Sequence, residues 1–349
     1  MSCRPAGSDL GSDLGSDLGS DLGSDPGFAA IVQARERIRA HLPVTPVVGH
    51  PGLSRAVGAK CFVKLENTQP VGAFKIRGGL NLLMSDSPRQ RAQGYVTATR
   101  GNHGQSLAYA CARFGSQCEL FVPRGNDPSK NLAMRELGAT LHVVGDDFDA
   151  ASAAAEERAA SSGARLVHPG RTPELVAGIG TWVLELLEQV DEPLDAVFVP
   201  VGVGSCIAGT ALALASLAPR TKLIGVQSEA APAMTLSWRS GQPVACRPTG
   251  DLADGLAVGK PVAETLEVME RLVDDMVLVS EATIAEAMRL YAGTVAQIAE
   301  GAGAAALAGA MALRGCFAGG RIAVLLSGGN IAPTRLMDVL SGGDVRLSA

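Results

Sequence analysis

A lysine in an apolar, glycine-rich loop is the first residue of this sequence that could do covalent chemistry. Lys75 lies in the segment Val71–Gly79, at the junction between a loop and a predicted helix. A partly desolvated lysine loses its proton more easily and can form a Schiff base with a carbonyl compound. The alternative is an ordinary surface lysine whose alkyl chain lies along Phe74.

A second loop could bind an anion and a separate oxygen atom. It runs through Thr99, Arg100, Gly101, Asn102 and His103, directly after a β-rich segment and at the start of a predicted helix. Backbone N–H groups at a helix start favour an anion such as a substrate carboxylate. The Asn102 amide could bind a phenolate or carbonyl oxygen. Capping of the helix by Thr99 or Asn102 is the alternative.

Two further glycine-rich loops follow predicted strands. Small residues from Gly202 to Gly209 would let consecutive N–H groups close on phosphate oxygens, with a plain tight turn as the alternative. Glu229 stands near the end of the next strand, where a dinucleotide-binding fold keeps its ribose acid, so NAD is a competing ligand for this loop. Ser327 could present its hydroxyl to a ring nitrogen, and a turn before the last helix is the alternative there.

The elements that must position these loops follow from hydrophobic periodicity. Short apolar runs alternate with Ala-rich helical stretches, which predicts parallel βαβ units that bind ligands at the carboxyl ends of their strands. The predicted strands are Cys61–Leu65, Tyr95–Ala98, Cys118–Val122, Thr140–Val144, Arg165–Val167, Ala196–Val199, Lys222–Val226, Met276–Val279 and Ile322–Leu326. The predicted helices are Phe28–His41, Ile76–Leu83, Gly104–Phe114, Lys130–Leu137, Asp147–Ser161, Val176–Val190, Cys206–Ala218, Glu281–Tyr291 and Gly303–Leu313.

Composition excludes several other classes of protein. A net charge of −5 argues against a nucleic-acid binder, which would carry a basic patch. The longest apolar runs are strand-sized, so we expect no membrane span. The 42 glycines among 349 residues exceed the usual share of roughly 7% and suit close backbone approach to phosphates. The five histidines lack helical metal spacing, so no metal site is expected from them.

The cysteines and the amino terminus bear on location and order. Seven dispersed cysteines without a CxxC pair, and no secretory h-region, predict a cytoplasmic protein. Residues 1–27 contain four copies of Gly-Ser-Asp-Leu. One leucine in every four residues buries too little surface to offset the entropy of ordering, so we expect a disordered tail.

Taken together, the loops resemble those of the pyridoxal-phosphate enzymes of fold type II, specifically the serine/threonine dehydratases. Gly-Ala-Phe-Lys75-Ile-Arg-Gly is similar to the family's Ser-Phe-Lys-x-Arg-Gly, and Thr-Arg-Gly-Asn102-His-Gly to its asparagine loop. The likeness runs from about Thr45 to Asn330. It also includes a phosphate loop at Gly202–Cys206, an Ala-Asp-Gly segment at Ala253–Val258, and the segments Glu300–Ala304 and Ser327–Asn330.

The resemblance implies a fold, a cofactor and a set of roles. The fold would be two open parallel-sheet α/β domains with pyridoxal 5'-phosphate in the cleft between them: a large domain of residues 28–84 and 174–349, and a small domain of residues 85–173. Lys75 would bind the cofactor and then act as general base at the substrate Cα. The other expected cofactor contacts are Phe74, Asn102, Gly202, Val203, Gly204, Ser205, Cys206 and Ser327. The substrate would be bound by Thr99, Arg100, Gly101, Asn102 and His103.

Three departures from the family pattern refine this expectation. Ala73 stands where the family usually has serine. Arg100 replaces the serine that racemising relatives use as a second base, which predicts elimination without efficient racemisation. Arg100 could instead read a second carboxylate, or form a salt bridge on the wall of the small domain. Gln227 and Ala233 replace two carboxylates that bind a divalent cation in several relatives, so no magnesium or calcium dependence is expected there.

The function expected from these residues is dehydration and deamination of a β-hydroxy amino acid. L-threonine or L-serine would give a 2-oxo acid and ammonia, in a homodimer without feedback inhibition by isoleucine. A bulkier or acidic substrate, such as phenylserine or 3-hydroxyaspartate, is the nearest alternative. From other classes, an NAD-dependent oxidoreductase and a cofactor-binding protein without turnover stay open.

Overall fold

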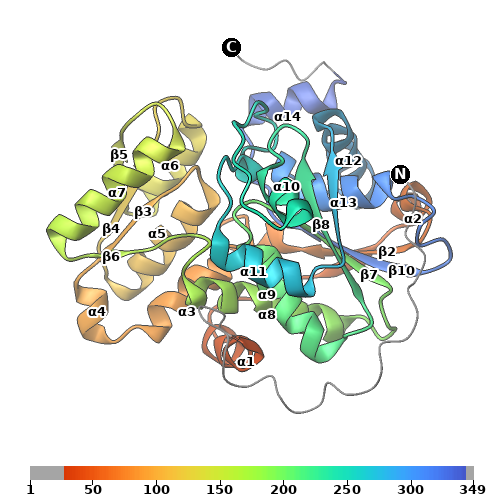
Figure 1. The fold of residues 1–349 in the computed structure, drawn as a ribbon, viewed down its shortest axis with the longest axis horizontal. Coiled ribbons are helices and arrows are strands. Elements are labelled where there is room, and N and C mark those ends of the chain that lie inside the picture. The colour runs from red at the N-terminus through yellow and green to blue at the C-terminus, as the bar shows by residue number, and fades with distance from the viewer. Residues whose placement is uncertain (1–26, 343–349) are drawn as a thin grey trace.

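The computed structural model describes residues 27–342, so the Gly-Ser-Asp-Leu repeats lie outside the described residues. Two separate sheets organise this part of the chain (Figure 1). One has six strands in the order β1-β2-β10-β7-β8-β9, and the other has four in the order β5-β4-β3-β6. The strands are β1 (Val47–Gly49), β2 (Lys60–Leu65), β3 (Tyr95–Ala98), β4 (Cys118–Val122), β5 (Thr140–Val143), β6 (Arg165–Leu166), β7 (Ala196–Pro200), β8 (Lys222–Ser228), β9 (Asp275–Val279) and β10 (Arg321–Leu326).

All nine predicted strands are present, and the prediction of two open α/β sheets is confirmed. Every described pairing between two of these strands is parallel except that of β1 with β2. The β1 strand was not predicted, because three residues are too few for hydrophobic alternation to be recognised. It adds one antiparallel edge to the larger sheet.

Helices cover the sheets and connect their strands. They are α1 (Gly27–Ile38), α2 (Pro51–Val57), α3 (Ile76–Ser85), α4 (Pro88–Ala92), α5 (Asn102–Phe114), α6 (Pro128–Glu136), α7 (Phe148–Ser162), α8 (Pro173–Gln189), α9 (Ser205–Leu217), α10 (Ala233–Ser240), α11 (Ala263–Leu272), α12 (Glu281–Val295), α13 (Gly301–Ala312) and α14 (Pro333–Leu340). In the described part of the chain, no helix is long and apolar enough to cross a membrane.

Five helices were not predicted from the sequence: α2, α4, α10, α11 and α14. Two of them are short and begin at a proline behind a capping side chain. His50 caps α2 through Gly52 N, and Ser87 forms a capping box with Gln90 at α4. Such starts depend on terminal hydrogen bonds rather than on an apolar stripe, so periodicity did not reveal them.

The larger sheet is buried on both faces. Along β10, Ile322, Val324 and Leu326 pack with α12 and α13 in one apolar cluster. Their neighbours Ala323 and Leu325 face α8 and α9 in a second cluster. Because both faces of this sheet are buried, residues that point to either face are apolar, and the strands appear in the sequence as nearly continuous apolar runs.

The smaller sheet is built the same way. Val96 and Ala98 of β3 pack against the alanines of α7, whereas Tyr95 and Leu120 pack with α5 and α6. Because its four strands all lie between Tyr95 and Leu166, we propose residues 85–173 as the small domain. The loops that follow β3, β7 and β10 all reach the cleft described next.

Candidate active site

A cleft of about 1200 Å³ collects the residues singled out from the sequence. It receives loops from both sheets, as expected where parallel strands end. Every predicted site residue lines it: Phe74, Lys75, Thr99, Arg100, Gly101, Asn102, His103, Gly202, Val203, Gly204, Ser205, Cys206 and Ser327.

Lys75 stands at the N-terminus of α3 and points into the cleft. Its Nζ donates to Ser205 Oγ at 2.8 Å and lies 5.1 Å from the centroid of the Phe74 ring. Ser106 Oγ donates to the Lys75 carbonyl at 2.6 Å, which fixes the backbone. Desolvation lowers the pKa of Lys75 to about 8. The surface-lysine interpretation is therefore wrong.

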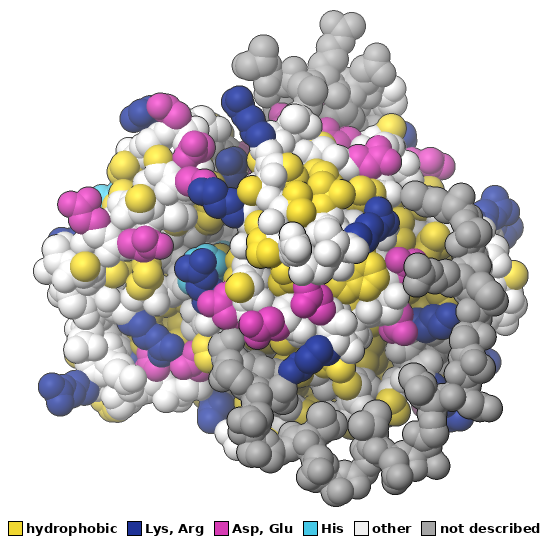
Figure 2. All heavy atoms as spheres, in the orientation of Figure 1, with side chains coloured by type: hydrophobic (Ala, Val, Ile, Leu, Met, Phe, Trp, Pro, Cys, Tyr) yellow, Lys and Arg dark blue, Asp and Glu magenta, His cyan; other side chains and the backbone are white. Residues whose placement is uncertain are grey.

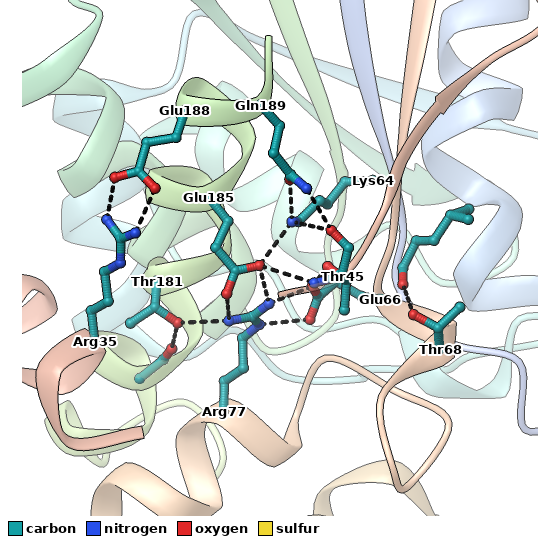
Figure 3. A network of polar contacts seen from close by, with 12 residues as sticks. Arg35, Thr45, Lys64, Glu66, Thr68, Arg77, Thr181, Glu185, Glu188 and Gln189 are labelled. Carbon is teal, nitrogen blue, oxygen red and sulfur yellow. Dashed lines mark hydrogen bonds and ion pairs between the residues drawn. The ribbon is translucent and has the colours of Figure 1, made fainter. Parts of the chain in front are cut away.

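A buried ionic network holds the start of α3 (Figure 3). Arg77 donates from Nε and Nη2 to the carboxylate of Glu66, and from Nη1 and Nη2 to that of Glu185, each at 2.7 Å. Lys64 Nζ donates to Glu185 and to the Thr45 carbonyl, both at 2.8 Å. Burial alone would raise the pKa of Glu185, but hydrogen bonds from Arg77 hold it below its usual value. The network ties α3 to β2 and α8, two residues beyond Lys75.

In the loop after β3, the side chains of Thr99 and Asn102 have different hydrogen-bond partners. Thr99 Oγ1 accepts from Gly101 N at 3.1 Å and from Gly104 N at 2.9 Å, so the capping interpretation is correct for Thr99. Asn102 does not cap. Its Nδ2 donates to Glu300, and its Oδ1 accepts from Asn330 Nδ2 at 2.8 Å. These contacts fix the amide orientation and leave the second N–H of Nδ2 for a ligand.

His103 is uncharged and has a defined tautomer. Burial lowers its pKa to about 3. Its Nε2 lies 3.0 Å from Thr97 Oγ1, whose hydroxyl donates to the Val167 carbonyl at 2.5 Å. His103 Nε2 therefore carries the hydrogen and donates to Thr97, which leaves Nδ1 as an acceptor.

A group of charged residues lies beside Asn102 and was not predicted from the sequence to be part of the site. Lys130 Nζ donates to Asp254 Oδ2 at 2.6 Å and to Glu300 Oε2 at 3.4 Å, which joins α6 of the smaller sheet to loops of the larger part. Burial raises the pKa of Glu300. Asp254 and Glu300 stood within motifs already noted, but nothing around Lys130 in the sequence distinguishes it from a surface lysine.

The N-terminus of α9 is open to an anion. Gly204 has φ of +95°, which L side chains rarely adopt, and a Cβ there would lie 2.4 Å from Thr265 Oγ1. No side chain caps this helix, so its first N–H groups are available to phosphate oxygens. Burial raises the pKa of Cys206 to about 12, which keeps that thiol protonated beside Lys75.

Ser327 follows β10 and is bound to the lysine loop. Its carbonyl accepts from Phe74 N at 3.0 Å, and the side chain is almost fully buried while still lining the cleft. The carboxyl end of β10 thus lies beside the residue that precedes Lys75, and Ser327 brings a neutral hydroxyl to the cleft wall.

The positions considered for a divalent cation have other roles. Gln227 Oε1 accepts from Thr235 N at 3.0 Å and from Thr235 Oγ1 at 2.9 Å. Glu229 is exposed and does not line the cleft. Within residues 27–342, no group of three His, Cys, Asp or Glu side chains could hold a metal ion. Independence from magnesium and calcium stays a prediction.

Comparisons with known proteins show which sequences and structures this chain is similar to. A family model described as "Pyridoxal-phosphate dependent enzyme" matches residues 38–328. An L-threonine ammonia-lyase of Geobacter sulfurreducens is 36% identical over 316 residues, which cover 90% of this chain and 78% of that protein. The catabolic L-threonine dehydratase TdcB of Escherichia coli is 35% identical over 311 residues, 88% of this chain and 94% of its own length. A solved structure of threonine deaminase isoform 2 from Solanum lycopersicum has a TM-score of 0.85 and 32% identity, covering 90% of this chain and 88% of its own.

Proposed function

The chain belongs to the pyridoxal-phosphate dependent enzymes and, within them, to the serine/threonine dehydratase family, and on this premise we propose that it is an ammonia-lyase for β-hydroxy amino acids. L-threonine or L-serine would lose the β-hydroxyl as water, and hydrolysis of the product would release a 2-oxo acid and ammonia. The observation that carries the proposal is the contact between Lys75 Nζ and Ser205 Oγ inside a cleft that Asn102 and Ser327 also line.

The residues of the cleft fit pyridoxal phosphate. The uncapped start of α9, with Gly202–Cys206, would hold the phosphate, and Lys75 would bind the carbonyl carbon. The free N–H of Asn102 would bind the 3'-oxygen, and the Ser327 hydroxyl would face the pyridine nitrogen. When bound, the cofactor withdraws electrons from the substrate Cα.

Each side chain then has a definite task. Lys75 Nζ takes the proton from Cα, a role that its lowered pKa favours because much of the amine is neutral near pH 8. Backbone N–H groups of Arg100, Asn102 and His103 would bind the substrate carboxylate at the start of α5, since those of Thr99 and Gly101 already donate to the Phe121 carbonyl and to Thr99 Oγ1. The Thr99 hydroxyl hydrogen is available to donate to it as well. Ser205 Oγ accepts from Lys75 and keeps the amine directed into the cleft. Ser327 offers a neutral hydroxyl rather than a carboxylate, which favours prompt elimination.

The other classes considered from the sequence have less support. An NAD-dependent oxidoreductase would need Glu229 near the phosphate loop, but Glu229 lies outside the cleft, and Lys75 and Asn102 would have no role. A binding protein without turnover would not need a lysine of lowered pKa in contact with Ser205.

Assembly and location extend the proposal. We expect a homodimer, which the family resemblance supports, and a cytoplasmic location, which the dispersed cysteines support. Five of the cysteines are free thiols, namely Cys61, Cys111, Cys118, Cys206 and Cys246.

The surface charge bears on possible partners. On the face drawn in Figure 2, basic and acidic side chains are interspersed rather than gathered in one basic patch.

The visible absorption spectrum of the purified protein tests the proposal. A yellow protein that borohydride bleaches, with a colourless Lys75→Ala variant, is the expected result, together with 2-oxo acid formation from L-threonine or L-serine. Lys222→Ala is the matched control, because Lys222 is an exposed lysine at the start of β8. A wild-type protein that stays colourless with added pyridoxal phosphate would overturn the proposal and favour the nicotinamide alternative.

A further inference from the structure

Arg100 is a cation of the cleft wall without a partner. It lies in the loop between β3 and α5 and lines the cleft. Its Nε is buried and has no hydrogen-bond acceptor among residues 27–342. The guanidinium also forms no ion pair in this part of the chain, so the salt bridge considered from the sequence is absent there.

The other lysine and arginine side chains considered in the cleft wall either form an ion pair or are open to water. Lys130 is paired with Asp254 and Glu300. Arg171 lies 3.5 Å from Glu264, and Lys260 lies 2.6 Å from Asp149. Arg247 is exposed, so water can satisfy its N–H groups. Arg100 alone among these cations combines a buried N–H with the lack of an acceptor.

The carboxylates that bind Lys130 form no ion pair with Arg100. A Cβ on Gly101 would lie 2.7 Å from Lys130 Cδ, so the Lys130 side chain occupies the space beside the loop. Glu300 already accepts from Asn102 and Lys130, and Asp254 accepts from Lys130. Burying an N–H without an acceptor is unfavourable, so a ligand in the cleft that supplies an acceptor to Arg100 would be favoured.

We propose that Arg100 binds a second carboxylate of the substrate, so that this chain acts on β-hydroxy amino acids with an acidic side chain, of which 3-hydroxyaspartate is the smallest. The inference rests on the proposed function and names its substrate class. A planar guanidinium matches a carboxylate through two parallel hydrogen bonds. The backbone of the same loop is expected to hold the α-carboxylate, which leaves the guanidinium for a second anion.

The reaction balances without a further reactant. Lys75 Nζ takes the Cα proton, the Cβ–O bond breaks, and the leaving hydroxide gains one proton and departs as water, so that the proton lost from Cα balances the proton gained by the hydroxide. Solvent water then hydrolyses the imine form of the product, which yields oxaloacetate and ammonia. No oxidant or reductant is consumed.

Turnover of matched substrates provides the first test. For wild-type holoenzyme, kcat/KM is expected to be higher for one stereoisomer of 3-hydroxyaspartate than for L-serine. Arg100→Gln should lower kcat/KM for the acidic substrate by on the order of 10- to 100-fold, the usual effect of losing a charged hydrogen bond. The loss of kcat/KM for L-serine, which has no second carboxylate, should be smaller. Equal losses for both substrates would place Arg100 on the shared α-carboxylate and overturn the proposal.

Binding without turnover separates this inference from the proposed function. L-aspartate and L-asparagine lack a β-hydroxyl and differ only in the charge of the side chain, so each can be titrated against the holoenzyme by its absorption spectrum. L-aspartate should bind about tenfold more tightly than L-asparagine, and Arg100→Gln should abolish the difference. Equal affinities in the wild-type protein, or a difference that Arg100→Gln leaves unchanged, would overturn the inference. In either case, turnover of L-serine would leave the proposed function intact.

Discussion

Arg77 binds both carboxylate oxygens of Glu66, from Nε to Oε2 and from Nη2 to Oε1, at 2.7 Å each. Both side chains are almost completely buried. The pair therefore lies in low dielectric two residues from Lys75, and it fixes the position from which α3 presents the lysine.

Replacing Arg77 should destabilise the protein strongly. Arg77→Met leaves the carboxylates of Glu66 and Glu185 buried without their main donor, and breaking a buried pair costs about 3–5 kcal/mol. Urea unfolding followed by circular dichroism measures the loss. The exposed pair Arg35–Glu188, also drawn in Figure 3, supplies the control, because Arg35→Met should cost no more than about 1 kcal/mol. Equal losses in the two variants would show that the buried network does not anchor α3.

The lowered pKa of Lys75 predicts how cofactor loading depends on pH. Only the neutral amine attacks a carbonyl, and the pKa of Lys75 is about 8. The neutral fraction, and with it the loading rate of the apo protein, should rise about fivefold between pH 7 and 8 and about twofold between pH 8 and 9. Stopped-flow absorbance after mixing with pyridoxal phosphate measures the rate. A rate that still rises tenfold from pH 8 to 9 would mean a lysine of ordinary pKa.

Thr99 and Asn102 should give opposite results on substitution. Thr99→Ala removes the acceptor for Gly101 N and Gly104 N, so it should lower the free energy of unfolding by about 1 kcal/mol, as loss of a helix cap does. Asn102→Ala leaves that cap intact. It should weaken cofactor affinity with a smaller change in stability, measured by equilibrium dialysis and urea unfolding. The assignment of roles fails if Asn102→Ala unfolds earlier than Thr99→Ala and still binds the cofactor normally.

The strands and the main site loops could be predicted because each rests on local pattern. Ser327 and the residues after Ala98 follow apolar runs that end in glycine-rich segments, and parallel sheets bring such ends together. The partners of these residues could not be predicted. Asn330 reaches Asn102 across 228 positions of sequence, and Lys130 reaches Glu300 across 170. Such pairs depend on how the two sheets pack, which periodicity within one segment does not encode.

Divalent cations should not affect activity through the positions after β8. Gln227 Oε1 is already bonded to Thr235, and a neutral amide is a poor substitute for the carboxylate charge that a hard cation requires. After treatment with EDTA and gel filtration, added magnesium or calcium should leave kcat/KM for L-serine unchanged. A requirement for either metal that survives this treatment would contradict the prediction. Glu229→Gln would then test whether the exposed carboxylate is a ligand.

Arg100 also predicts the stereochemical outcome of the reaction. Racemisation needs a base on the face of Cα opposite Lys75, and a guanidinium does not give up its proton at neutral pH. With L-serine, the enzyme should therefore form 2-oxo acid and ammonia with far less D-serine, measured by chiral chromatography beside an oxo-acid assay. Arg100→Ser places a hydroxyl in the same loop and should raise the ratio of D-serine to 2-oxo acid, whereas Arg100→Ala should not. If the wild-type protein forms D-serine as fast as 2-oxo acid, a base other than residue 100 serves the second face.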